Sequence, residues 1–452
     1  MGMGLTRDRA RNIFLAVLVI LSFYLSYRLW TAGREIGTEE IPTGQITRTN
    51  VSLTSHSPSD TFRPPLVALH GLNPLRPTLV SHTYSLRTLI DQEYSKRNLD
   101  QIVRSDTMSN SEYLNDLQSG SWLEFVYYEE MPLGMFEQKF AEISRDYTNA
   151  FFNRILIDID NRDFVNFYHT ETEELYVASV LAGEEIEISP FLNQENLNYA
   201  DAFPPLMTDN IIYLPSDTVD VSYRSFVIDQ LSSSVYINSF FPDTSLVDVR
   251  STDTTTRYID LTKEVTINNV TNRLSFVRQI SDPGELEPAS RYTRSFDQIN
   301  RFENWAESFI LSSYDREAET IAFRREISGF PVFSLQDNEA VSTIQLVETG
   351  VTNLDLALRF ISTPITLLDI DETETTRTVT SGSEVIEMLR RMRNGELLYR
   401  IDNIVLGYTW EESDEDSQVV NFIPEWYVMV DGTWVSYESL LELHEEDVTY
   451  GL

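Results

Sequence analysis

The residues that most often bind metals or move protons are few in this sequence and widely spaced. The five histidines are His56, His70, His82, His169 and His444, and there is no cysteine. No two of these histidines have the spacing of ligands in a zinc site. Without cysteine, disulfides and thiol chemistry are excluded. We therefore predict no metal site and no cofactor.

One histidine has a local context that could serve catalysis. Leu69-His70-Gly71 ends a short apolar run, as the His-Gly pair before an oxyanion loop does in some hydrolases. Such an enzyme also needs the nucleophile elbow G-x-S-x-G, which the sequence lacks. His70 and His82 flank one loop, and a loop or surface position explains them more simply. A hydrolase that uses His70 stays open as a hypothesis, but we predict no catalytic residue and no enzyme.

Two groups of acidic residues could attract cations. Asp158-x-Asp160-x-x-Asp163 resembles the start of a calcium loop, but it lacks the glycine at the sixth position and the glutamate at the twelfth. A strand end followed by a polar turn explains it better. Residues 411–416 contain five acids in six positions. Between two strands, this run is most simply a solvated loop, with a weak divalent-ion site as the alternative.

The overall charge limits the possible partners. The 452 residues include 71 acidic and 34 basic ones, which gives a net charge of −37. Nucleic acid binding needs a basic surface, so it is excluded, and anionic lipid headgroups are repelled as well. Because the acids are spread along the chain, they indicate solubility or a salty habitat more readily than a cation or basic partner.

Residues 13–30, IFLAVLVILSFYLSYRLW, are the longest apolar stretch and carry no charge before Arg28. A helix of this length spans about 27 Å, close to the ~30 Å hydrocarbon core of a bilayer. Aromatic residues gather at its C-terminal end, as in the interfacial belt of membrane helices. We predict a single transmembrane helix here.

The charges before this stretch predict its orientation. Arg7, Arg9 and Arg11 precede it, so residues 1–12 are expected in the cytoplasm and the bulk of the chain outside the cell membrane. A cleaved signal peptide is the alternative, and Thr31-Ala32-Gly33 offers small residues for cleavage. The apolar run is long for a signal peptide, and the aromatic belt would have no purpose in one.

The rest of the chain predicts an α+β ectodomain of several domains, with mainly antiparallel sheets and packed helices. Residues 31–62 are rich in Thr, Ser, Gly and Glu and indicate a tether. With about 150 residues per domain as a guide, we place an N-terminal domain at 63–200, a middle domain at 201–292 and a C-terminal domain at 293–452.

Apolar periodicity and capping patterns predict individual elements. Helices are expected over 82–104, after Ser109, over 224–233, after Ser295 and after Ser381. Asp431-Gly432 between two apolar runs predicts a tight hairpin.

Several stretches resemble the YycH family of Gram-positive bacteria. They are the apolar segment ending in LVILSFYLSYRLW, the stretch TIAFRREISGFPVF at 320–333, and the run from Ile404-Val405-Leu406-Gly407-Tyr408 through Pro424-Glu425-Trp426-Tyr427-Val428 to Asp431-Gly432-x-Trp434. The order of short start, one span, tether and ectodomain is similar too. The low lysine content and strong acidity make this chain a divergent-looking member.

The resemblance implies a membrane-anchored, non-enzymatic regulator in two-component signal transduction. Such proteins act with a related membrane protein, YycI, on an essential sensor histidine kinase, WalK, which controls cell-wall metabolism. The resemblance also implies that contact is made through the membrane helices. An anchored envelope protein that binds a cell-wall polymer or a cation is the alternative function.

The predicted span contains a surface suited to helix contact. Ser22 and Ser26 form a small-x-x-x-small pair, and Leu15, Val19 and Leu29 fall near the same face. Small residues four apart allow close approach of helices in lipid, where packing rather than the hydrophobic effect drives association. Serines in such helices also commonly bond to their own helix carbonyls. We therefore expect these five residues to contact the partner helices, with internal bonding of the serines as the open alternative.

Overall fold

The structure is a computed structural model that describes residues 56–73, 76–82, 97–192, 199–203, 211–365, 376–414 and 416–450. All of them belong to one compact unit, Leu53–Leu452. The predicted span at 13–30 lies outside the described residues. Among the helices that are described, none has the length and apolar character needed to cross a membrane. The prediction of an α+β fold with mainly antiparallel sheets is confirmed.

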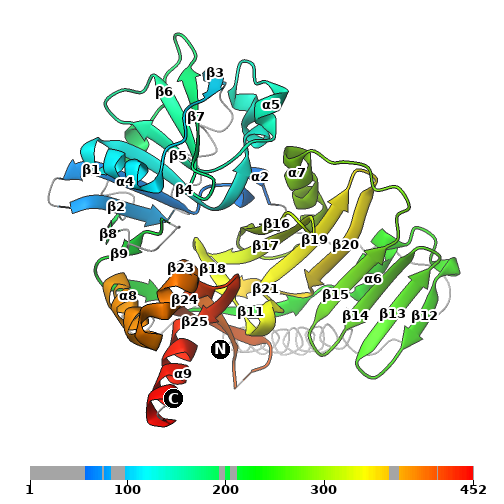
Figure 1. Ribbon diagram of the computed structural model, residues 1–452. Helices are drawn as coiled ribbons and strands as arrows, with labels where there is room; N and C mark the ends of the chain where they lie inside the picture. Colours follow the sequence, from blue (N-terminus) through cyan, green and yellow to red (C-terminus); the bar gives the residue numbers. More distant parts are fainter. Residues whose placement is uncertain are drawn as a thin grey trace, which may run out of the picture. The chain divides into compact units, whose positions relative to one another are not determined.

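The first sheet has nine strands in the described part of the chain, in the order β3-β7-β6-β5-β4-β1-β2-β8-β9 (Figure 1). Every neighbouring pair in it is antiparallel. The strands are β1 Leu66–Asn73, β2 Arg76–His82, β3 Leu99–Arg104, β4 Trp122–Pro132, β5 Phe151–Asp158, β6 Phe164–His169, β7 Glu174–Val180, β8 Ala200–Phe203 and β9 Leu214–Pro215.

The second sheet has fourteen strands within the described ranges. Its main path is β12-β13-β14-β15-β20-β19-β17-β18-β23-β24-β11-β21, with β16 beside β17 and β25 beside β24. The strands are β11 Arg224–Gln230, β12 Asp248–Ser251, β13 Thr255–Asp260, β14 Lys263–Asn268, β15 Arg273–Arg278, β16 Phe309–Asp315, β17 Thr320–Ile327, β18 Phe330–Phe333, β19 Val341–Val347, β20 Gly350–Ala357, β21 Arg359–Pro364, β23 Ile401–Glu412, β24 Val419–Val430 and β25 Thr433–Ser436. A separate pair joins β10 Val219–Ser222 to β22 Thr376–Val379.

Helices are attached to both sheets. In Figure 1, α7 lies beside β19, and α9 lies beside β24 and β25. The α-helices are α2 Pro58–Thr61, α4 Asn110–Ser119, α5 Arg145–Thr148, α6 Ser233–Phe240, α7 Pro288–Ile299, α8 Gly382–Arg391 and α9 Tyr437–Tyr450. The 3-10 helices are η2 Leu133–Lys139, η3 Ser189–Leu192, η4 Thr244–Leu246, η5 Leu335–Asp337 and η7 Met392–Arg400.

Two of the predicted helix caps and the predicted hairpin are confirmed. Ser109 and Ser381 accept hydrogen bonds from the backbone N–H groups of Glu112 and Glu384, at the starts of α4 and α8. Asp431 and Gly432 both have positive φ, +48° and +75°, as the turn between β24 and β25 requires. The two caps and the turn are local structures, so residues close in the sequence are enough to determine them.

Two predicted helices are wrong where the structure describes them. The end of the 82–104 prediction is strand β3, and most of the 224–233 prediction is strand β11, with helix α6 starting at Ser233. Residues 83–96 lie outside the described residues. In both cases a short apolar run fits the period of a helix and that of a strand. Pairing of β3 with β7 and of β11 with β24 makes these residues strands.

The helix predicted to start after Ser295 is also wrong. Helix α7 starts at Pro288, ends at Ile299 and buries Ser295 completely. Proline at the first helical position has a preset φ suited to a helix start. Phe309 and Ile310, further along the chain, belong to strand β16.

The limits proposed for three domains, at 201 and 293, stay a prediction. The second sheet takes its strands from both sides of residue 292: β15 pairs with β20, and β11 pairs with β24. Strands far apart in the sequence therefore share one hydrogen-bonded sheet.

The end of the predicted tether is folded where the structure describes it. His56 and Asn300 exchange two hydrogen bonds of 3.1 Å, between the backbone of His56 and the side-chain amide of Asn300. Phe62 is 3% exposed and packs against the rings of Tyr292, Phe296 and Phe323. The chain therefore enters the described structure attached to α7 and β17.

Candidate functional site

A cleft of about 460 Å³ lies between residues of the two sheets. On one side it is lined by the second half of β4 and the turn after β6, and on the other by Tyr314, Arg316 and the start of β23. Charged lining residues from both sides include Glu129, Glu130, His169, Arg316 and Asp402. We call this space the intersheet cleft.

A buried carboxylate, Glu124 on β4, lies next to the cleft and has no exposed surface. One oxygen accepts a hydrogen bond of 2.6 Å from the Tyr113 hydroxyl and lies 3.3 Å from Nε of Arg154. The other accepts a bond of 2.7 Å from the Tyr213 hydroxyl and lies 2.8 Å from Nε2 of His70. Burial by itself raises the pKa of Glu124, but these donors and the charge of Arg154 lower it below its usual value.

The prediction that His70 is a loop or surface residue is therefore wrong. It lies on β1, is 3% exposed, and its Nδ1 is 3.1 Å from the Thr78 hydroxyl. Both ring nitrogens have buried partners, so His70 orients Glu124 rather than facing a substrate. The guanidinium of Arg154 reaches further, to the carbonyl oxygens of Tyr127 and Ile211. The cluster thus ties β1, β4 and β5 to α4 and to residues 211–213.

Glu130 joins the two sides of the cleft. Its carboxylate accepts a bidentate pair of hydrogen bonds from Arg316, just after β16, and one from His169 Nε2 at 3.3 Å. Its backbone oxygen accepts a bond of 2.9 Å from the Tyr292 hydroxyl of α7. Although burial alone raises the pKa of Glu130, these hydrogen bonds lower it. Strand β4 is therefore fastened to elements of the second sheet at this residue.

The pKa of the neighbouring Glu129 is shifted in the opposite direction from that of Glu130. Burial, and then the charge of Glu130, raise its pKa to about 8. At neutral pH most of this carboxyl is protonated and can donate a hydrogen bond. The cleft thus presents one neutral acid beside an ionised one.

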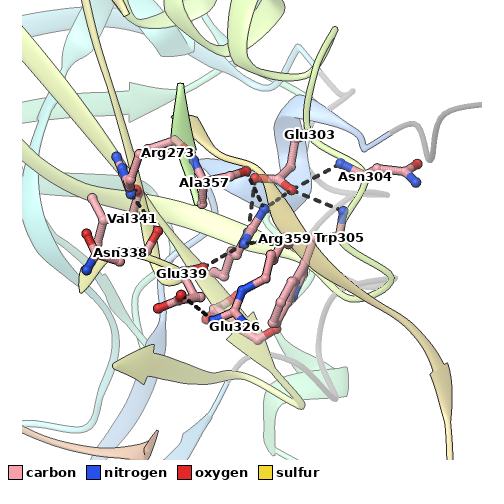
Figure 2. Close-up of polar contacts among 12 residues, drawn as sticks. Arg273, Glu303, Asn304, Trp305, Glu326, Asn338, Glu339, Val341, Ala357 and Arg359 are labelled. Atoms are coloured by element: carbon pink, nitrogen blue, oxygen red, sulfur yellow. Dashed lines mark hydrogen bonds and ion pairs between the residues drawn. The ribbon is translucent and has the colours of Figure 1, made fainter. Parts of the chain in front are cut away.

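A second set of buried charges includes Arg325 and Glu326 on strand β17, and Figure 2 shows Glu326 with Glu303 and Glu339 nearby. Arg325 is 3% exposed and donates hydrogen bonds of 2.7 and 3.2 Å to the carboxylate of Glu303. It also donates to the carbonyl oxygens of Glu339 and Arg359, each at 2.6 Å, and its guanidinium lies 4.8 Å from the Trp305 ring centre. The pair holds β17, β21 and the loop after α7 together.

The neighbouring Glu326 extends this set to the start of the described chain. It forms an ion pair with Arg63, which precedes β1, and both side chains are at most 1% exposed. The Ser308 hydroxyl also donates to Glu326, at 3.0 Å. Arg324, on the other side of Arg325, forms a bidentate pair with Asp337.

The acidic groups identified from the sequence have structural roles where they are described. Asp158 accepts hydrogen bonds from the backbone N–H groups of Asp160 and Asn161 in the turn after β5. Glu412, from the acidic run, pairs with Arg359 at 2.5 Å. Among the described residues, no group of three or more His, Asp or Glu is placed to hold a metal ion. Glu124, Glu130, Glu303 and Glu326 are each paired with a basic side chain, so the arrangement can hold separate elements together.

The predicted contact residues Leu15, Val19, Ser22, Ser26 and Leu29 lie outside the described residues, so their role stays a prediction. Sequence reasoning missed Glu124, Arg154 and the pair Glu303–Arg325. A signal existed, since Glu124 and Arg325 each lie inside a run typical of a buried strand. A charge in such a run needs a partner, but the sequence does not say which residue supplies it.

Comparison with known proteins gives family matches over most of the chain. A family model described as YycH protein, N-terminal domain, matches residues 8–188, and one described as YycH protein, C-terminal domain, matches residues 209–442. The crystal structure of YycH from Bacillus subtilis is similar, with a TM-score of 0.67 and 15% identity, covering 86% of this chain and 99% of that one. An uncharacterized protein from Eubacterium rectale matches at a TM-score of 0.32 and 12% identity, over 48% of this chain and 81% of its own. No curated protein matches the chain.

The Glu124 cluster predicts a large loss of stability when its charge is removed. Glu124→Gln leaves Arg154 buried without its anion, so we expect the free energy of unfolding to fall by about 3–5 kcal/mol. Glu142→Gln, at an exposed position, is the matched control and should change it by less than about 0.5 kcal/mol. Urea unfolding of the full chain measures both. Equal stability of the two variants would contradict the role given to Glu124.

The raised pKa of Glu129 predicts a dependence of stability on pH. Between the usual value of 4.5 and about 8, the folded state holds a proton that the unfolded state has lost. The contribution of Glu129 to the free energy of unfolding must therefore fall as the pH rises through this range. Glu129→Gln cannot ionise, so its stability relative to wild type should increase by about 1–3 kcal/mol from pH 5 to pH 8.5. Thermal unfolding at several pH values tests this, and a constant difference would show that Glu129 ionises normally.

Proposed function

Because the chain belongs to the YycH family, we propose that it is a membrane-anchored accessory protein that regulates a WalK-type sensor histidine kinase from outside the cytoplasm. The family identity supports a regulator of this kinase, also called YycG, and a regulatory rather than an enzymatic role. The observation that carries the proposal is the pair of family matches at residues 8–188 and 209–442.

The proposed location rests on the first thirty residues. Residues 13–30 would form the single span, with the arginines at 7, 9 and 11 keeping the start of the chain in the cytoplasm. The compact unit from Leu53 onward would then face the outside of the cell membrane. Its net negative charge suits a role that needs no contact with anionic headgroups beyond the anchor.

The proposed partners are the kinase and a YycI-like membrane protein, and the proposed contact is made by membrane helices. Leu15, Val19, Ser22, Ser26 and Leu29 would form the contact face. The contacts of His56 and Phe62 with α7 and β17 would connect such a contact to the second sheet, because they hold the described chain end nearest the span. Regulation of cell-wall homeostasis would follow from the kinase that is bound.

The contact face predicts which substitutions break the association. Interhelical polar contacts in membranes contribute only about 0.6 kcal/mol on average, so steric blocking should act more strongly than removal of a hydroxyl. Ser22→Leu combined with Ser26→Leu should reduce co-purification of the full chain with its kinase at least tenfold. Ser→Ala at both positions should have a mild effect.

Phe14→Leu and Phe23→Leu, off the proposed face, are the controls and should be tolerated. Co-purification of the double leucine variant at the wild-type level, with normal abundance in the membrane, would exclude Ser22 and Ser26 from the interface.

A further inference from the structure

A small cavity of about 80 Å³ lies on one face of the first sheet. Its wall consists mainly of apolar residues from the central strands, with Phe125 on β4, Ile157 on β5 and Phe167 on β6 among them. Ile188 and Phe191, in the segment after β7, line its other side. The cavity shares Tyr127 with the intersheet cleft, but none of the charged residues that line the cleft lines the cavity.

One polar side chain in this wall has no hydrogen-bond partner within the described ranges. Asn98 is 1% exposed, and neither its amide nitrogen nor its amide oxygen is hydrogen-bonded to a described residue. Its backbone is held on both sides, since its N–H donates to the carbonyl oxygen of Lys139 and its carbonyl accepts from the N–H of Leu181. A buried amide left unpaired costs about 1–3 kcal/mol, so such a group is rare without a reason.

The combination of an apolar wall and one unused amide defines the chemistry of an occupant. The amide of Asn98 offers a donor and an acceptor at the same point. A lone water molecule is a poor fit, because ordered buried waters need two to four polar partners. The other lining residues with polar side-chain groups, Tyr127, Lys139 and Glu187, already have interactions of their own.

We propose that this cavity binds a short aliphatic molecule whose single neutral head group, such as a carboxamide, both donates to and accepts from Asn98. The volume is about half of the ~150 Å³ cavity that takes up benzene, so it suits an aliphatic part of a few carbon atoms. A peptide is a worse match, since each residue brings a further backbone donor and acceptor that the apolar wall leaves unpaired. This site is independent of the regulatory role proposed above.

Butanamide is a suitable probe, and its binding to the full chain can be titrated by saturation-transfer NMR. We expect saturable binding to the wild-type chain. Asn98→Leu should raise the Kd about tenfold or more, because both hydrogen bonds of the head group are lost. Asn269→Leu, at an exposed asparagine in the turn between β14 and β15, is the matched control and should leave the Kd unchanged.

A second variant keeps the test decisive if Asn98→Leu does not fold. Val165→Leu adds one methylene group to the cavity wall and should weaken butanamide binding several-fold while the chain stays folded. Wild-type affinity for butanamide in either folded variant would overturn the proposal, as would the absence of saturable binding to the wild type. Tighter competing binding of N-acetylleucinamide would also overturn it, by assigning the cavity to a peptide.

Discussion

The ion pair between Arg63 and Glu326 connects the start of the described chain to the middle of the second sheet. Both side chains are almost completely buried, so neither charge is stable there without the other. Glu326 lies beside Arg325, which is itself held by Glu303 and by backbone carbonyls of two other segments. The path from Arg63 into β17 therefore fixes how the chain from the predicted anchor joins the second sheet.

Pairing of buried charges from different elements also holds the first sheet against the second. Glu130 of β4 binds Arg316 and, through its backbone, Tyr292. Glu124, deeper in the first sheet, accepts from donors on two strands, one helix and the segment just before β9. Because each of these charges has its partner on another element, the elements cannot separate without leaving a buried charge unpaired. We infer that the described part of the chain behaves as a connected body rather than as loosely linked modules.

How much of this could be predicted from the sequence depends on the range of the interactions. The caps at Ser109 and Ser381 and the Asp431-Gly432 turn depend on neighbouring residues, and they were predicted. Ser295 has a similar capping pattern, but it lies inside α7, which begins at Pro288. The helix start predicted at Ser295 was therefore wrong. Strands β3 and β11 have apolar runs that fit a helix equally well, and only pairing with distant strands decides them. The partners of Glu124 and Arg325 come from up to about ninety residues away, so no local pattern contains them.

The central claim is that the chain regulates its kinase through the membrane segment at 13–30. The most direct test measures autophosphorylation of the kinase in proteoliposomes that contain the full chain. It compares the native chain with one in which residues 13–30 are replaced by an unrelated apolar segment of equal length. We predict that the native chain changes the rate of autophosphorylation and that the replaced chain, inserted to the same extent, leaves it at the level of the kinase alone. An equal effect of both chains would contradict the claim and assign regulation to the ectodomain.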